Sequence, residues 1–144
     1  MPEENSLSEY INKSNEITKV FDKKIRIALL SSFTINGLSE ILKVKSIERD
    51  ISCTVYEAPY NQYSQQILNK KSDLYKFLPD ITFLILDTRN IFGEIFRFPY
   101  SISHLERAKI VENKINEIKN LLDTYIENSN SKIIVTKLNI PSFS

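Results

Sequence analysis

The sequence Lys24-Ile25-Arg26-Ile27-Ala28-Leu29-Leu30 leads directly into the polar cluster Ser31-Ser32-Phe33-Thr34-Ile35-Asn36-Gly37. From residue 25 to residue 30 the run is apolar except for Arg26. Such a nearly continuous apolar run favours a strand covered on both faces, as in a parallel sheet. Two later runs have the same form, residues 51–56 before residues 57–63 and residues 81–86 before residues 87–90.

Helical patterns separate these strand-like runs. A fourth strand is predicted at residues 132–137, and the helices at residues 6–20, 37–47, 61–78 (in pieces) and 105–128. Ser6 or Ser8 is the expected N-cap of the first helix and Asn36 that of the second. Strands that alternate with helices predict right-handed parallel crossovers. We therefore predict a three-layer α/β/α domain with a parallel sheet in the order 2-1-3-4.

The composition is that of an ordinary globular domain. The 144 residues are 42% apolar and 26% charged, with a net charge of +1, which gives no general attraction to nucleic acid or to an acidic membrane. The single Cys53 excludes an internal disulfide and a multi-cysteine zinc site. Its place in a predicted strand indicates a buried, inert thiol. Two glycines are too few for a glycine-rich phosphate loop.

No targeting or membrane segment is visible in the sequence. The first six residues are acidic and polar, whereas a secretory signal needs a basic start and an apolar stretch. No run approaches the roughly 18 apolar residues of a membrane span. We therefore expect a cytoplasmic protein that binds neither membrane nor nucleic acid.

The predicted topology also places a candidate site. The carboxyl ends of parallel strands share one edge, and open α/β sheets bind ligands in the crevice at that edge. The polar residues expected there as ligand-binding groups are Ser32, Thr34, Asn36, Tyr60, Asn61, Gln62, Asp87, Thr88, Arg89 and Asn90. Their hydroxyl, amide, carboxylate and guanidinium groups suit a polar or anionic ligand, with Arg89 pairing with the anion.

Each of these residues also has a purely structural interpretation. Ser31 or Ser32 would be a nucleophile only with a base within reach, and the one histidine is His104; otherwise both hydroxyls hold the turn or cap the next helix. Asp87 and Arg89 would alternatively form an internal pair. The aromatic segment 91–104 is predicted as a loop, either exposed as a partner surface or folded inward as a lid.

Three segments resemble the N-terminal domain of FkbH-like proteins of the HAD superfamily. They are Ile27-Ala28-Leu29-Leu30-Ser31-Ser32-Phe33-Thr34, the segment from Tyr56 to Tyr63 with Gln66-Ile67-Leu68, and the segment from Leu74 to Ile81 that leads to Leu86-Asp87-Thr88-Arg89. The resemblance implies a flavodoxin-like or SGNH-hydrolase-like domain that precedes a HAD catalytic domain.

The resemblance also implies a biochemical setting. Such proteins are linked to loading a glyceryl or acyl unit onto a carrier protein in polyketide or surface-glycan biosynthesis. The HAD aspartate motif is absent from these 144 residues. We therefore expect a single domain, residues 1–144, that is the N-terminal part of a longer protein and is itself non-catalytic. The chain would bind no cofactor, and Mg would belong to the HAD domain. The expected partners are a carrier protein, the HAD domain, or a small acyl or phosphorylated ligand.

Two alternative functions follow from the same residues. One is an SGNH-type serine esterase, because the serine of that family also follows the first strand. Against it, Pro59-Tyr60-Asn61 stands where the family has a glycine, Asp87-Thr88-Arg89-Asn90 does not match the third-strand motif, and the C-terminal aspartate-x-x-histidine is missing. The other alternative is a standalone binding module of flavodoxin-like shape.

Overall fold

A computed structural model describes residues 5–138 of the chain. Its elements, in chain order, are α1 (Leu7–Asn15), β1 (Lys24–Ser31), α2 (Leu38–Ile47), β2 (Ser52–Glu57), α3 (Tyr63–Leu68), α4 (Asp73–Phe77), β3 (Ile81–Ile85), α5 (Thr88–Phe92), α6 (Glu94–Arg97), α7 (His104–Asn128) and β4 (Lys132–Val135). The four strands form one parallel sheet in the order β2-β1-β3-β4. The predicted fold class and strand order are therefore confirmed.

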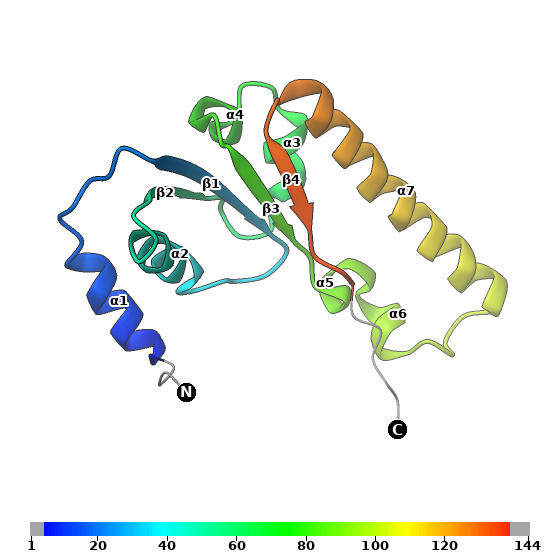
Figure 1. Ribbon diagram of the computed structural model, residues 1–144. Helices are drawn as coiled ribbons and strands as arrows, with labels where there is room; N and C mark the ends of the chain where they lie inside the picture. Colours follow the sequence, from blue (N-terminus) through cyan, green and yellow to red (C-terminus); the bar gives the residue numbers. More distant parts are fainter. Residues whose placement is uncertain (1–4, 139–144) are drawn as a thin grey trace.

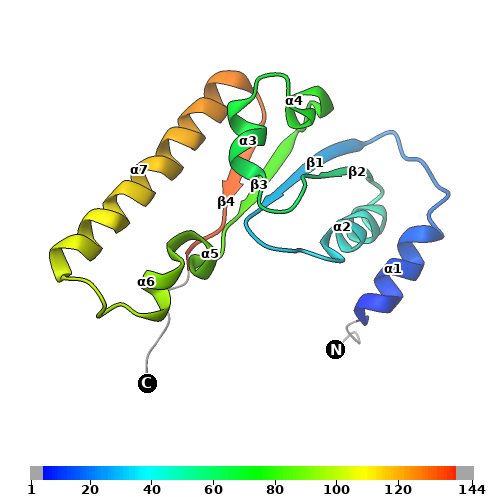
Figure 2. The same ribbon diagram turned by 180° about the vertical axis from the view of Figure 1, so that it is seen from behind.

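Helices cover the two faces of the sheet unequally. Figures 1 and 2 show α3 and α7 on one side of β3 and β4, and no described helix in front of these two strands on the opposite side. Register assigns the side chains to the faces: Leu29 pairs with Phe83, and Leu84 pairs with Val135. The core beneath α3, α4 and α7 contains Ala28, Leu30, Ile67, Leu74, Leu84, Leu86, Ile91, Leu121 and Tyr125.

A buried hydrogen bond fixes α7 to the sheet. The hydroxyls of Thr82 on β3 and Tyr125 on α7 lie 2.6 Å apart, and both residues are fully buried. Only the second half of α7 reaches this core. Leu105 and Ile115 in the first half are 81% and 49% exposed, and Figure 1 shows this half projecting beyond the strands.

The starts of α1 and α2 test the two N-caps predicted from the sequence. Ser6 caps α1 in a capping box with Glu9, as one of the two expected serines. The prediction that Asn36 caps the second helix is wrong, because Gly37 occupies that position with φ of 87°. That φ lies in the left-handed region, which favours glycine. A Cβ at Gly37 would also lie 2.1 Å from Cδ1 of Leu7 on α1.

The aromatic segment 91–104 is only partly a loop. The short helices α5 and α6 occupy most of residues 88–97. Phe92 and Phe96 are partly buried, whereas Phe98 and Tyr100 are 64% and 90% exposed. The segment therefore combines the two expected arrangements: its first rings fold inward and its last rings face solvent.

Candidate functional site at the carboxyl edge of the sheet

Ser32 and Asp87 meet where β1 and β3 end. The Asp87 N–H donates a 2.9 Å hydrogen bond to the Ser32 hydroxyl, and the Ser32 N–H donates a 3.0 Å bond to the carbonyl of Ile85. Ser32 is 1% exposed. The structure thus brings together two of the predicted site residues, and their contact extends the pairing of β1 with β3 beyond the last strand residues.

Thr136 makes the equivalent contact from the other neighbour of β3. The Leu86 N–H donates a 3.0 Å bond to the Thr136 hydroxyl, and the Thr136 N–H donates a 3.1 Å bond to the carbonyl of Leu84. The chain leaves β3 with the N–H groups of Leu86 and Asp87. Hydroxyls that follow β4 and β1 accept hydrogen bonds from these two successive groups. Sequence reasoning missed Thr136; a hydroxyl residue near the end of the fourth strand was the available signal.

Ser31 holds its own turn. Its hydroxyl donates to the Phe33 carbonyl at 2.7 Å and accepts from the Phe33 N–H at 3.1 Å. His104 is the first residue of α7 and is exposed. Figures 1 and 2 both place the start of α7 well away from the end of β1. The structure therefore does not bring the histidine beside either serine.

Asp87 and Arg89 occupy the first turn of α5. Asp87 is the N-cap, and its carboxylate accepts the Arg89 N–H at 3.4 Å. The Arg89 guanidinium lies 5.8 Å from the centre of the Phe96 ring, and the side chain is exposed. The ion pairs found between described residues involve other side chains. The Arg89 guanidinium thus lies near the Phe96 ring, and its charge stays accessible to solvent.

The remaining predicted residues lie on the rim of this edge, where most are exposed and Thr88, the first residue of α5, is partly buried. Pro59 to Gln62 form a turn closed by a 3.1 Å bond from the Gln62 N–H to the Pro59 carbonyl, with φ of 54° at Asn61. Tyr60 is 63% exposed, and Thr34, Asn36 and Asn90 are also exposed. Neither Ser32 nor Asp87 lines any of the four main cavities on the described surface. Ligand binding at this edge therefore stays a prediction.

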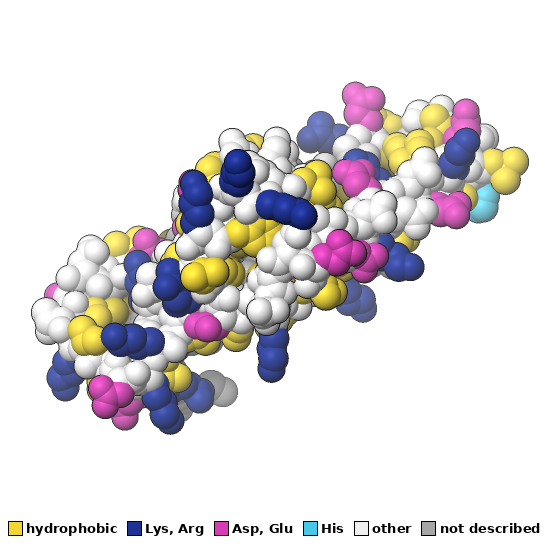
Figure 3. Space-filling model, turned by 90° about the horizontal axis from the view of Figure 1, so that it is seen from above, with side chains coloured by type: hydrophobic (Ala, Val, Ile, Leu, Met, Phe, Trp, Pro, Cys, Tyr) yellow, Lys and Arg dark blue, Asp and Glu magenta, His cyan; other side chains and the backbone are white. Residues whose placement is uncertain are grey.

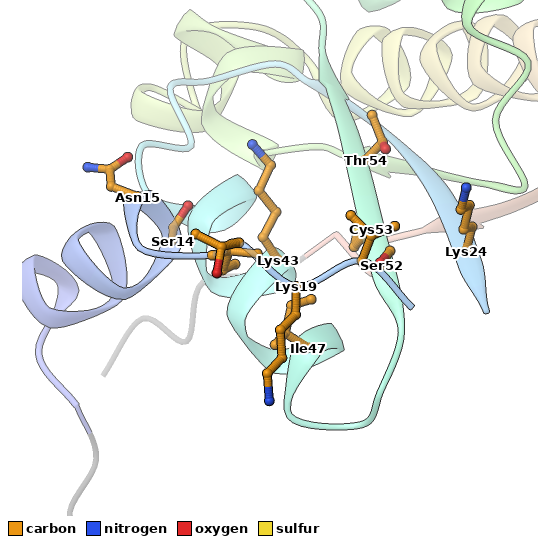
Figure 4. Close-up of a pocket in the computed structure, with 12 residues that line it drawn as sticks. Ser14, Asn15, Lys19, Lys24, Lys43, Ile47, Ser52, Cys53 and Thr54 are labelled. Carbon is orange, nitrogen blue, oxygen red and sulfur yellow. The ribbon is translucent and has the colours of Figure 1, made fainter. Parts of the chain in front are cut away.

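Cavities occur elsewhere on the described surface. One of about 480 Å³ lies near the opposite edge, between the end of α1, α2 and the start of β2. Lys19, Lys24 and Lys43 line it, but Figure 4 shows the ammonium groups of Lys19 and Lys43 pointing in opposite directions. Figure 3, a view from above Figure 1, likewise shows basic and acidic side chains interspersed. The lysines do not form a convergent anion site.

Cys53 lines the same cavity. Burial raises the pKa of its thiol, against smaller lowering effects of a hydrogen bond with Ser46 and the charge of Lys43. A raised pKa disfavours the reactive thiolate. Three further cavities lie between the ends of α4 and α7, beside α3 and α4, where Gln62 lies on the wall, and between α6 and α7.

The family model described as FkbH, N-terminal domain, matches residues 26–142. The chain belongs to this family. The match covers the sheet from Arg26 of β1 onward and the helices between its strands, so the FkbH N-terminal domain is the α/β unit described above. The resemblance seen in the sequence is thereby confirmed.

A solved structure has the same fold. It is the crystal structure of the N-terminal part of the protein BF1531 from Bacteroides fragilis, containing a phosphatase domain complexed with Mg. The match has a TM-score of 0.75 at 22% identity and covers 96% of this chain and 35% of that one. The FkbH N-terminal domain thus spans about a third of the chain it matches. No curated protein matches it significantly.

The described residues carry neither a membrane span nor a metal cluster. None of the helices of the FkbH N-terminal domain within residues 5–138 is long and apolar enough to cross a bilayer. Within the same residues, no group of three His, Cys, Asp or Glu side chains is placed to hold a metal ion.

Proposed function

We propose that this chain is a non-catalytic domain that positions a carrier protein or an acyl substrate for a phosphatase-type domain of the same polypeptide. The family match and the phosphatase domain in the solved structure with this fold support the positioning role. The observation that supports a non-catalytic role is the engagement of both serines at the carboxyl edge. Ser32 accepts the Asp87 amide, and Ser31 holds the Phe33 turn. The hydroxyls of Ser31 and Ser32, at the edge where a site is expected, therefore form hydrogen bonds with backbone groups.

An esterase would need different geometry at the same place. A serine nucleophile requires a base within hydrogen-bond reach of its hydroxyl, and His104 stands at the start of α7. Ser32 is also 1% exposed and its hydroxyl accepts the Asp87 N–H, so it is poorly accessible to a bulky ester. The esterase is accordingly the weaker hypothesis.

A hydrolysis assay tests the non-catalytic assignment. We expect the purified chain to release nitrophenol from nitrophenyl acetate or butyrate no faster than an equal concentration of the Ser31→Ala or Ser32→Ala variant. Thermal unfolding of each variant shows whether it is folded at the assay temperature. Hydrolysis that is lost in a folded serine variant would establish the esterase instead.

A deletion in the complete polypeptide tests the positioning role. Removing this domain should raise KM for a carrier-bound substrate by about tenfold, which corresponds to about 1.4 kcal/mol. Turnover of free nitrophenyl phosphate should stay unchanged, because uniform binding of a remote group affects KM rather than the chemical step. Equal KM values with and without the domain would contradict the proposal.

A further inference from the structure

One face of β3 and β4 is apolar and only partly covered. Register places Leu29, Phe83 and Ile134 side by side on the face that carries α2. Ile81 and Ile85 flank Phe83 on the same face, since side chains two residues apart on a strand share a face. We call Ile81, Phe83, Ile85 and Ile134 the open face.

Burial falls steadily along this row from the centre of the sheet outward. Leu29 on β1 is 1% exposed, Phe83 on β3 is partly buried, and Ile134 on β4 is 46% exposed. On the opposite face, the neighbouring residues Leu84 and Thr82 are fully buried beneath α7 and its partners. The contrast lies in coverage, because Figure 1 shows no described helix in front of β3 and β4 on the open side.

Parallel sheets are characteristically covered on both faces. Charge or polar residues would be expected on β3 if this face were built to meet water, yet Ile81, Phe83 and Ile85 are all apolar. Of the four residues, Ile134 is exposed and Ile81, Phe83 and Ile85 are half-buried. A contiguous apolar surface that the described helices leave partly open fits a docking site. Lys132 lies on the same face, opposite Ile81, and is exposed, so a cation stands at the rim of the patch.

We propose that the open face docks the domain that follows this one in the same polypeptide, which presents an apolar surface with a carboxylate facing Lys132. The inference rests on the proposed function, because it requires a following domain. Two observations select this occupant. The matched family is an N-terminal domain, and the solved structure with this fold has about two-thirds of its chain outside the matched part.

The test compares two isoleucine substitutions in the two-domain polypeptide. Ile134→Glu places a charge on the open face, whereas Ile126→Glu changes a 62% exposed isoleucine of α7 and is the matched control. We expect Ile134→Glu to speed proteolytic cleavage between the domains at least fivefold and to increase the radius of gyration in small-angle scattering. Ile126→Glu should change neither.

The same variants in the 144-residue chain show that the substitutions act on docking. Both should remain monomeric by light scattering and unfold at the temperature of the parent chain. Docking is overturned if Ile134→Glu leaves cleavage and scattering of the two-domain protein unchanged. It is also overturned if the isolated chain is a dimer that Ile134→Glu dissociates, because the occupant would then be a second copy. These readouts are independent of activity, so they separate a failure of docking from a failure of the positioning role.

Discussion

At the scale of single residues, two hydroxyl groups determine the path of the backbone at the candidate site. Ser32 and Thr136 come from strands on either side of β3 and accept the amides of Asp87 and Leu86. Where one strand of a parallel sheet extends beyond its neighbours, its next backbone N–H groups have no carbonyl partner and need other hydrogen-bond acceptors. The side chains supply these acceptors, which sets the direction in which the Asp87–Asn90 segment leaves the sheet.

Replacing Ser32 by alanine should therefore destabilise the fold. The Asp87 amide loses its acceptor in a part-buried place, and we expect the free energy of unfolding to fall by about 1–3 kcal/mol. Urea denaturation of the variant measures this change. Thr34→Ala, at an exposed position two residues away, should stay within about 0.5 kcal/mol of the parent. A Ser32→Ala chain as stable as the parent would contradict the role given to this hydroxyl.

The longest element, α7, depends on how it begins. Ser103 and Glu106 form a capping box: the Glu106 N–H donates to the Ser103 hydroxyl, and the Glu106 carboxylate accepts the Ser103 N–H at 2.9 Å. Hydrogen bonds from the Ser103 backbone and hydroxyl lower the pKa of Glu106 from 4.5. Because the first half of α7 has little tertiary support, this local motif carries much of its stability.

The capping box predicts a pH dependence for the helix start. A carboxyl whose pKa is lowered by folding stabilises the fold above its unfolded pKa, and this contribution is lost as the pH falls through the folded value. The stability difference between the parent and Glu106→Gln should therefore be largest near pH 7 and shrink below pH 4.5. Denaturation at the two pH values measures it. Glu112→Gln, farther along the same helix, is the control, and a difference that is independent of pH would refute the assignment.

At the scale of the whole molecule, the sheet carries buried apolar side chains on both of its faces. Leu29 is buried on the side of α2 and Leu84 on the side of α7, and they lie on adjacent strands of one sheet. Because β1 and β3 belong to both layers of side chains, removing buried atoms from one face weakens the strands that support the other face. We therefore expect the two layers to unfold together.

Substitution of either leucine tests this cooperativity. Leu29→Ala and Leu84→Ala should each cost about 2–5 kcal/mol, and each variant should show one unfolding transition when followed by circular dichroism and by tyrosine fluorescence. Leu105→Ala, at an 81% exposed position, should cost little. Transitions that separate between the two probes would show that the layers unfold independently.

Much of the fold was readable from local pattern, and the failures have non-local causes. The strands and their order follow from apolar runs separated by helical periodicity. Gly37 replaced Asn36 as the N-cap because the backbone there is left-handed and α1 packs close to it. Ser32 and Asp87 were correctly placed at one edge, but that Ser32 serves the Asp87 amide depends on the β1–β3 register. Thr136 was missed for the same reason, because the register between β3 and β4 cannot be deduced from the sequence of either strand alone.

The projecting half of α7 affects how the molecule moves through solution. At 1.5 Å per residue the 25 residues of the whole of α7 span about 37 Å, whereas the four residues of β4 span about 13 Å. Figure 1 places the start of α7 and α1 at opposite ends. An elongated particle has a larger Stokes radius than a sphere of equal mass. A monomer of 16.8 kDa should therefore elute from a gel-filtration column ahead of globular standards of that mass, and its rotational diffusion should be anisotropic.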